Sequence, residues 1–427
     1  MSVKVLCCSK GSQWLALTVL LLGGCQRTLI PTPTVYIDRT PDPFQGVPEA
    51  HQTTIFQMPY VTDRAPIERK GRPLRYGHDR SRSLAFGRCS IEIGRDMSWE
   101  EVAELSKVKR RGRRILVEAG EKTEIGRFPS VPMPVTVQDG LPTVDPTALA
   151  GNLQATEALQ DMVRQSLETA TKKEVFITVH GVNNTFDDAV LRAADLWHFF
   201  GRQAVVICYT WPAGHPGLFE GYHYDHVSSR FTVFHFKQLI RTLAEMEEVH
   251  RINVIAHSRG TDVTTSALRE LFLEGFGDEF EHNRIGDVVL FAADLDWQVV
   301  LQRDVGHYVF SMFDRLTIYV SKDDVALDVS SLLWRSVQRL GRVRLEDLTE
   351  TERDLIRIAG SIDIIDVRIR PRALGHSYFD DPAVFSDLIL LLLDDRPPGA
   401  SHGRPLEVVV PGFWVLRDGY PAVSADR

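Results

Sequence analysis

The feature that most constrains this chain is a nine-residue stretch, INVIAHSRG, at residues 252–260. Its first five residues are typical of a buried strand, and the residues that follow it (TDVTTSALREL) have the spacing of a helix. Ser258 therefore lies on a sharp turn that pushes its hydroxyl out of the sheet and places a helix behind the amide of Arg259. Ala256 and Gly260 are small enough for the backbone to double back. The pattern predicts that Ser258 is a nucleophile, although an ordinary strand-to-helix turn has the same signature.

Apolar strands alternate with helices from about residue 150 onward. Such alternation predicts an α/β fold with a mainly parallel sheet, helices on both faces and an N-terminal strand extension. A proline-rich stretch at 128–146 is expected to be irregular. The expected strands are residues 53–61, 84–93, 175–179, 204–209, 252–256, 287–292, 316–320 and 361–367, with a late strand or extended tail at 407–416. The expected helices are residues 153–171, 186–200, 231–249, 261–276 and 382–393.

The first 25 residues predict export. Residues 1–24 carry two lysines, no acidic residue and a short apolar run that is too short to span a bilayer. The sequence LGGC that ends at Cys25 resembles a bacterial lipobox, in which the cysteine is diacylated and becomes the new N-terminus. A plain secretory signal or an uncleaved anchor is the alternative. Gln26 favours the outer membrane, so we expect a lipid-anchored protein that faces the periplasm.

The remaining chain divides by composition. Residues 25–50 contain five prolines and are expected to form a flexible tether. One folded domain is expected over residues 51–396, with a strand-rich part at 51–150 and the catalytic core at 151–396. The last residues, 397–427, are expected to be a tail.

Composition narrows the classes of partner. The chain is 44% hydrophobic, which suits a globular protein, and its formal net charge of −8 argues against nucleic acid. A basic run, KVKRRGRR at 107–114, is either a solvated face or a contact for anionic lipid headgroups. Cys89 and Cys208 imply no disulfide framework. No cofactor is expected, and no cluster of metal ligands stands out.

A serine nucleophile requires a base and an acid that orients it. His376 lies between the last core strand and the last helix, where the base is expected. Either Asp323 or Asp324, which follow the preceding strand, can supply the acid. Asp294 and Asp296 form a second candidate pair, and they alternatively cap a helix that begins near residue 297.

An oxyanion hole requires two backbone amides beside the nucleophile. Arg259 supplies the first. The second is expected from HGVNN, which follows the early strand at 175–179. Gly181 lets the backbone approach the substrate there. Val182 is the candidate donor, and Asn183 is a candidate brace for the loop.

Several of these segments together resemble a bacterial α/β-hydrolase family, known mainly as a domain of unknown function and described as esterase- or lipase-like. The resemblance covers about residues 50–395. It rests on YVTDR (60–64), LAFGRCSIEIG (84–94), VHGVNNTF (179–186), YTWPAG (209–214), GYHYD (221–225), IAHSRG (255–260), AADLD (292–296), YVSKDDVAL (319–327) and GHSYF (375–379).

The resemblance implies an α/β-hydrolase fold and a triad of Ser258, Asp324 and His376. It favours Asp324 over Asp323 because the residues that follow the two aspartates fix how this stretch aligns with the family pattern. The chain departs from the family pattern after the serine, where such elbows carry Met or Leu in place of Arg259. We expect this arginine either to favour anionic substrates or to point to solvent.

The combined interpretation is a serine hydrolase of the cell envelope that cleaves a small-molecule or lipid ester through an acyl-enzyme. A non-catalytic envelope protein that keeps the fold as a binding or scaffold module is the competing hypothesis. A phospholipase is a third, which rests only on the lipid anchor and the basic run.

Overall fold

The structure is a computed structural model that describes residues 27–37, 39–67, 69–276, 284–334, 338–370 and 375–421. The predicted leader and Cys25 lie outside the described residues. The strands are β1 (Ile55–Pro66), β2 (Tyr76–Ile93), β3 (Val117–Arg127), β4 (Val135–Gln138), β5 (Leu141–Val144), β6 (Glu174–Val179), β7 (Val205–Thr210), β8 (Arg251–His257), β9 (Ile285–Phe291), β10 (Phe313–Val320), β11 (Ile362–Arg368), β12 (Glu407–Val410) and β13 (Phe413–Arg417). The helices are α1 (Trp99–Leu105), α2 (Pro146–Thr169), α3 (Phe186–Phe199), α4 (Leu218–Phe231), α5 (Val233–Ala244), α6 (Gly260–Leu273), α7 (Trp297–Val300), α8 (Val325–Trp334), α9 (Glu350–Ala359) and α10 (Pro382–Leu392).

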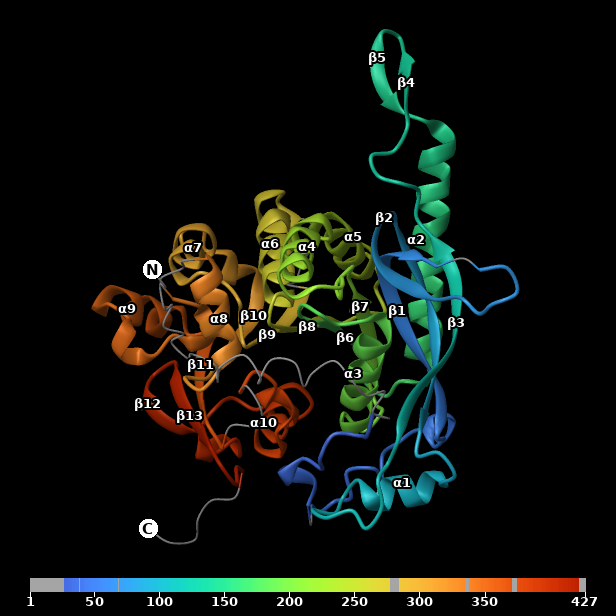
Figure 1. Ribbon diagram of the computed structural model, residues 1–427. Helices are drawn as coiled ribbons and strands as arrows, with labels where there is room; N and C mark the ends of the chain where they lie inside the picture. The colour runs from blue at the N-terminus through green and yellow to red at the C-terminus, as the bar shows by residue number, and fades with distance from the viewer. Residues whose placement is uncertain are drawn as a thin grey trace, which may run out of the picture.

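One 11-stranded sheet forms the centre of the molecule, in the order β12-β13-β11-β10-β9-β8-β6-β7-β1-β2-β3 (Figure 1). Neighbours from β13 to β1 pair in parallel, and the strands at the two ends, β12 with β13, β1 with β2 and β2 with β3, pair antiparallel. The predicted mainly parallel sheet with an N-terminal strand extension is confirmed.

Helices cover both faces of this sheet, and the side chains of each strand alternate between two hydrophobic cores. On β8, Val254 and Ala256 pack into the core beneath α2, α5 and α6. Ile255 points the opposite way, into the core beneath α3 and α10. Both faces are therefore buried, which explains why the central strands are apolar along their whole length.

The expected tether is wrong for the described residues up to position 50. Leu29, Tyr36, Phe44 and Val47 are all buried in the core beside α3, and the Tyr36 hydroxyl donates to the carbonyl of Phe199 (2.5 Å). These buried contacts hold the segment on the body.

Of the two expectations for residues 407–416, the late strand is confirmed and the extended tail is wrong, because this segment completes the sheet. Strand β13 pairs in parallel with β11, and β12 folds back on it as a hairpin. Arg404, which is fully buried, donates two hydrogen bonds to Asp387 of α10 (2.9 and 2.7 Å). Burial of this ion pair fixes the C-terminal segment on the body.

The stretch expected to be irregular contains a β-hairpin. Strands β4 and β5 are joined at Asp139 and Gly140, whose φ angles are 52° and 79°, as a two-residue hairpin turn requires. Figure 1 shows this hairpin standing away from the body at the start of α2. Asp145 caps α2, which begins at Pro146 instead of the expected residue 153.

The basic run at 107–114 is partly structural. Arg111 turns inward and donates to the carbonyl of Leu29 (3.0 Å) and to Thr32 (3.1 Å). Lys107 pairs with Asp42 (2.5 Å). Within the described residues, no helix combines the length and the apolar character needed to cross a membrane.

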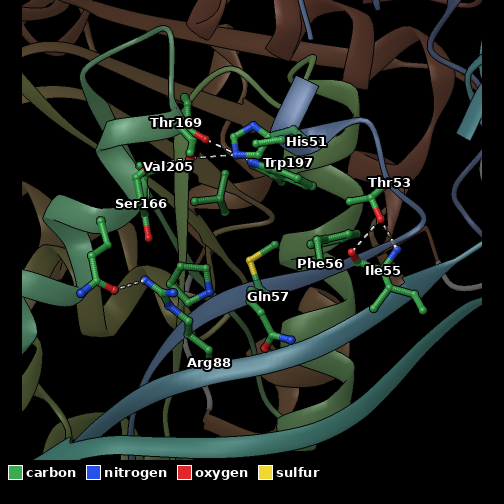
Figure 2. Close-up of a pocket in the computed structure, with 16 residues that line it drawn as sticks. His51, Thr53, Ile55, Phe56, Gln57, Arg88, Ser166, Thr169, Trp197 and Val205 are labelled. Carbon is green, nitrogen blue, oxygen red and sulfur yellow. Dashed lines mark hydrogen bonds between the residues drawn. The ribbon is translucent and has the colours of Figure 1, made fainter. Parts of the chain in front are cut away.

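A cavity of about 280 Å³ opens where β1 and β7 diverge below their three paired residues (Figure 2). Its His51 ring contacts Thr169 Oγ1 (3.0 Å) and the Arg202 carbonyl (2.8 Å), while Ser166 donates to the Met162 carbonyl (3.0 Å). Histidine and serine are thus engaged with other groups, and this cavity lacks the pairing that serine chemistry needs.

Candidate active site

Ser258 occupies the sharp turn that the sequence predicts. Strand β8 ends at His257, α6 begins at Gly260, and Ser258 between them has a φ of 53°, an uncommon value for a residue with a side chain. A Cβ on Gly260 would lie 2.5 Å from the carbonyl oxygen of Val179. Only glycine lets α6 start this close to β6. This close packing holds Ser258 in its strained turn.

The loop after β6 lies against this serine. A Cβ on Gly181 would come within 2.7 Å of the Ser258 Cβ and 3.2 Å of its Oγ. Val182, the next residue, lines the same cavity as Ser258. The structure therefore brings the candidate oxyanion-hole loop to the candidate nucleophile.

His376 and Asp324 form a hydrogen-bonded pair. The His376 Nδ1 lies 2.8 Å and 3.0 Å from the two carboxylate oxygens of Asp324. Asp324 is fully buried and also caps α8, because Leu327 N donates to its Oδ1 (3.1 Å). The His376 side chain keeps 21% of its surface exposed, so the ring can still meet a substrate.

The pair and the serine face one cavity. Ser258 and His376 both line a pocket of about 280 Å³ at the carboxyl end of β8. In the described part of the chain, no hydrogen bond joins the Ser258 hydroxyl to the imidazole; in ligand-free enzymes this bond is often long and tightens only with substrate. The ring of His257 braces His376, with Nε2 lying 3.2 Å from the His376 carbonyl.

The other candidate acids lie elsewhere. Asp323 lines a small neighbouring cavity with Ser321. Asp296 accepts hydrogen bonds from two amides at the start of α7 and is a helix cap, which was the alternative expected for it. Asp294 lies beneath the elbow and pairs with Arg259.

Neither expectation for the Arg259 side chain holds. Its guanidinium is buried and pairs with Asp294 and, at 3.7 Å, with Asp262. Arg259 does not line the cavity of Ser258, and its guanidinium also lies 3.4 Å from the hydroxyl of Tyr222 on α4. Burial alone would raise the pKa of Asp294, but Arg259 and Arg339 outweigh it and hold that pKa below its ordinary value.

A histidine that the sequence interpretation overlooked orients the Val182 amide. Trp211 N donates to His180 Nε2 (3.1 Å), so the ring proton is on Nδ1 and is donated to the Gly181 carbonyl (2.8 Å). In a trans peptide the following N–H, that of Val182, points the opposite way. Burial, aided by the Arg64 charge, lowers the pKa of His180 to about 3, so the ring stays neutral.

Arg64 of β1 holds this loop in place through hydrogen bonds. The guanidinium is buried and donates to the carbonyls of Asn184 (2.8 Å) and Ala213 (2.8 Å) and to Thr210 Oγ1 (2.9 Å), and it lies 3.3 Å from His180 Nε2. A single side chain from the N-terminal extension thus ties the loops after β6 and β7 together.

Two more polar groups complete the loop. The carboxylate of Asp225 accepts from the amides of Asn183 (2.8 Å) and Gly214 (3.0 Å). The side chain of Asn184 donates to the Val182 carbonyl (2.8 Å), so Asn184 braces the loop through its side chain, whereas Asn183 does so through its amide. The motifs YVTDR and GYHYD were the only sequence signals for Arg64 and Asp225.

Comparison with known proteins places this geometry in a family. A search of curated proteins finds no match to the chain. The model of a family described as "Alpha/beta hydrolase of unknown function (DUF900)" matches residues 155–394, a range that holds Ser258, Asp324, His376 and Val182. The match covers more than half of the chain, so the protein belongs to this family of α/β-hydrolases of unknown function.

Proposed function

We propose that this α/β-hydrolase is a serine hydrolase that cleaves carboxylic esters through Ser258, His376 and Asp324. The observation that carries the proposal is the hydrogen bond between the buried Asp324 and His376, whose ring opens onto the same cavity as a serine held on a strained elbow. A base that is oriented by a buried acid is the arrangement that activates a hydroxyl.

The reaction follows from these positions. Asp324 keeps the proton of His376 on Nδ1, so Nε2 is free to take the Ser258 proton as the oxygen attacks the ester carbonyl. The imidazolium then gives that proton to the leaving alcohol, and an acyl-enzyme forms. Water, activated by the same ring, attacks the acyl-enzyme and restores the serine.

The amides of Val182 and Arg259 would stabilise the oxyanion. Arg259 N lies at the start of α6, where unpaired amides and the helix dipole favour negative charge. His180 fixes the peptide between Gly181 and Val182, and Asn184 fixes the carbonyl of Val182. The Val182 amide therefore needs little rearrangement to donate to the oxyanion as charge develops.

A fluorophosphonate probe tests the chemistry directly. The wild type should be labelled, Ser258→Ala should not, and p-nitrophenyl esters should be cleaved only by the wild type. Ser377→Ala is a matched control, because Ser377 lines the same cavity beside the base. A protein that takes no probe and cleaves no ester would favour the non-catalytic binding module instead.

We further propose that the enzyme works at the bacterial cell envelope, anchored by lipid on Cys25. The support is the leader and lipobox pattern in the sequence. Arg27 is fixed to α3 through Asp195, and Val117 N donates to its carbonyl (2.9 Å). Arg27 follows Cys25 by two residues, so at most about 7 Å of chain separates them. Cys25→Ser should move the protein from the membrane fraction to the soluble one.

A further inference from the structure

The cavity at Ser258 continues as a slot between the sheet and two helices. Ile255 of β8 lies below the elbow on the face that α3 and α10 cover. Ala189 and Leu196 of α3 and Leu388 of α10 line the same cavity. The slot therefore runs inward from the reacting serine, beneath the helices, and does not lie across the protein surface.

The inner walls of the slot suit an uncharged, apolar group. Besides the aliphatic residues, Phe291 and Phe385 line it. The ionised side chain there, Arg192, is paired with Asp380. The pKa of His257 is held well below its usual value by burial and by His376, so that ring is neutral. An anionic substituent would lose its hydration in the slot and would have to compete with Asp380 for Arg192, and a cationic one would find no carboxylate among the described lining residues.

The spacing of the lining residues on α3 indicates the length of the slot. Ala189 and Leu196 are seven residues apart on one helix, which spans about 10 Å along the axis. The cavity volume of about 280 Å³ leaves room for several methylene groups beside the serine. An extended acyl chain of about eight carbons, counted from the ester carbonyl at Ser258, has a length of about 10 Å and matches this span.

We propose that this slot is the acyl subsite of the enzyme and that it takes a straight saturated acyl chain of medium length, about eight carbons. The inference rests on the proposed serine chemistry and names the substrate class for it: esters of medium-chain fatty acids, bound with the chain between the sheet and α3 and α10. We expect Leu388, which lines the cavity from α10, to limit the chain length that is accepted.

A series of p-nitrophenyl esters from acetyl to hexadecanoyl tests the proposal. Each methylene that enters the slot should raise kcat/KM about fourfold until the chain reaches about eight carbons. Longer chains should then lose rate. Leu388→Phe should move the optimum shorter by two or more carbons, and Leu388→Ala should move it longer.

Leu391→Ala is the matched control: Leu391 is fully buried on the same helix but does not line the cavity. It should lower thermal stability as Leu388→Ala does and leave the optimum unchanged. Ser258→Ala supplies a readout without turnover: methyl octanoate should raise its Tm, and methyl acetate should not.

The outcomes separate the two proposals. No probe labelling and no cleavage at any chain length would reject the serine chemistry. Labelling of Ser258 with a flat or acetyl-preferring series would reject the slot alone, as would an optimum that Leu388 variants leave in place.

Discussion

Asp324→Asn is the substitution that most directly tests the proposed chemistry. In the wild type the carboxylate accepts from His376 Nδ1 with both oxygens (2.8 and 3.0 Å) and from Leu327 N with Oδ1 (3.1 Å). An asparagine keeps its oxygen on Leu327 N, since that amide can only donate. Its NH2 group then faces Nδ1, which must become an acceptor. The ring proton moves to Nε2, where the serine proton should be received.

The expected loss is large because the wrong tautomer removes the base and leaves the fold in place. A misoriented base of this kind lowers kcat by about 10⁴-fold, which corresponds to about 5.4 kcal/mol of transition-state stabilisation. Asparagine has nearly the same volume as aspartate, so the buried site is not emptied. KM should change little, because neither group is required to hold the ground-state ester.

The assay is steady-state hydrolysis of a p-nitrophenyl ester, with urea unfolding to check the fold. Asp323→Asn is the matched control, because Asp323 lines a different cavity, and it should lower kcat less than threefold. A wild-type rate for Asp324→Asn, or a larger loss at Asp323, would refute the assignment of the acid.

Three further predictions concern the elbow and its loop. Gly181→Ala places a Cβ 2.7 Å from that of Ser258, so kcat should fall about 100-fold with an unchanged circular-dichroism spectrum; an unaffected rate would place the loop elsewhere. The folded-state pKa of His180 is about 3, below its unfolded value, so the unfolded state binds more protons. The neutral His180 therefore contributes up to about 5 kcal/mol to the free energy of unfolding. This stabilisation is complete above pH 6.5 and is lost as the pH falls toward 3. Urea unfolding at a series of pH values should show a smaller decrease in His180→Gln than in the wild type, and an equal decrease in both would contradict the prediction. Asp294→Ala leaves the buried Arg259 without its main partner and should lower the free energy of unfolding by about 3–5 kcal/mol, measured by urea unfolding; a loss under 1 kcal/mol would show that the pair is not effectively buried.

Local patterns predicted the elbow, because the strand, the turn and the helix around Ser258 are contiguous in sequence. The order of strands was enough to single out His376. Reasoning from residues alone left Asp323 and Asp324 open, since neighbouring loop residues point in different directions that only the turn decides. The same limit applies to Arg259, whose direction depends on Asp294 beneath the elbow.

The sequence predictions were wrong where contacts between distant residues decide the structure of a segment. Prolines predicted a tether before residue 50, yet Tyr36 and Phe44 bury their rings on α3. Residues 407–416 were open between a late strand and a tail, and the pairing of β13 with β11, which decides for the strand, is a distant contact. The support that His180 receives from Arg64 joins residues more than a hundred positions apart, and no local spacing encodes it.

Arg64 reaches from β1 into the loop after β6 and supports the site from a distant part of the chain. The family match begins at residue 155, downstream of the strand that carries this guanidinium. A polypeptide cut back to the matched region would retain serine, histidine and aspartate but would leave the carbonyls of Asn184 and Ala213 without their buried donor. The matched region therefore leaves out a side chain that supports the site, and a chimaera with a relative should transfer β1 together with the loop it supports.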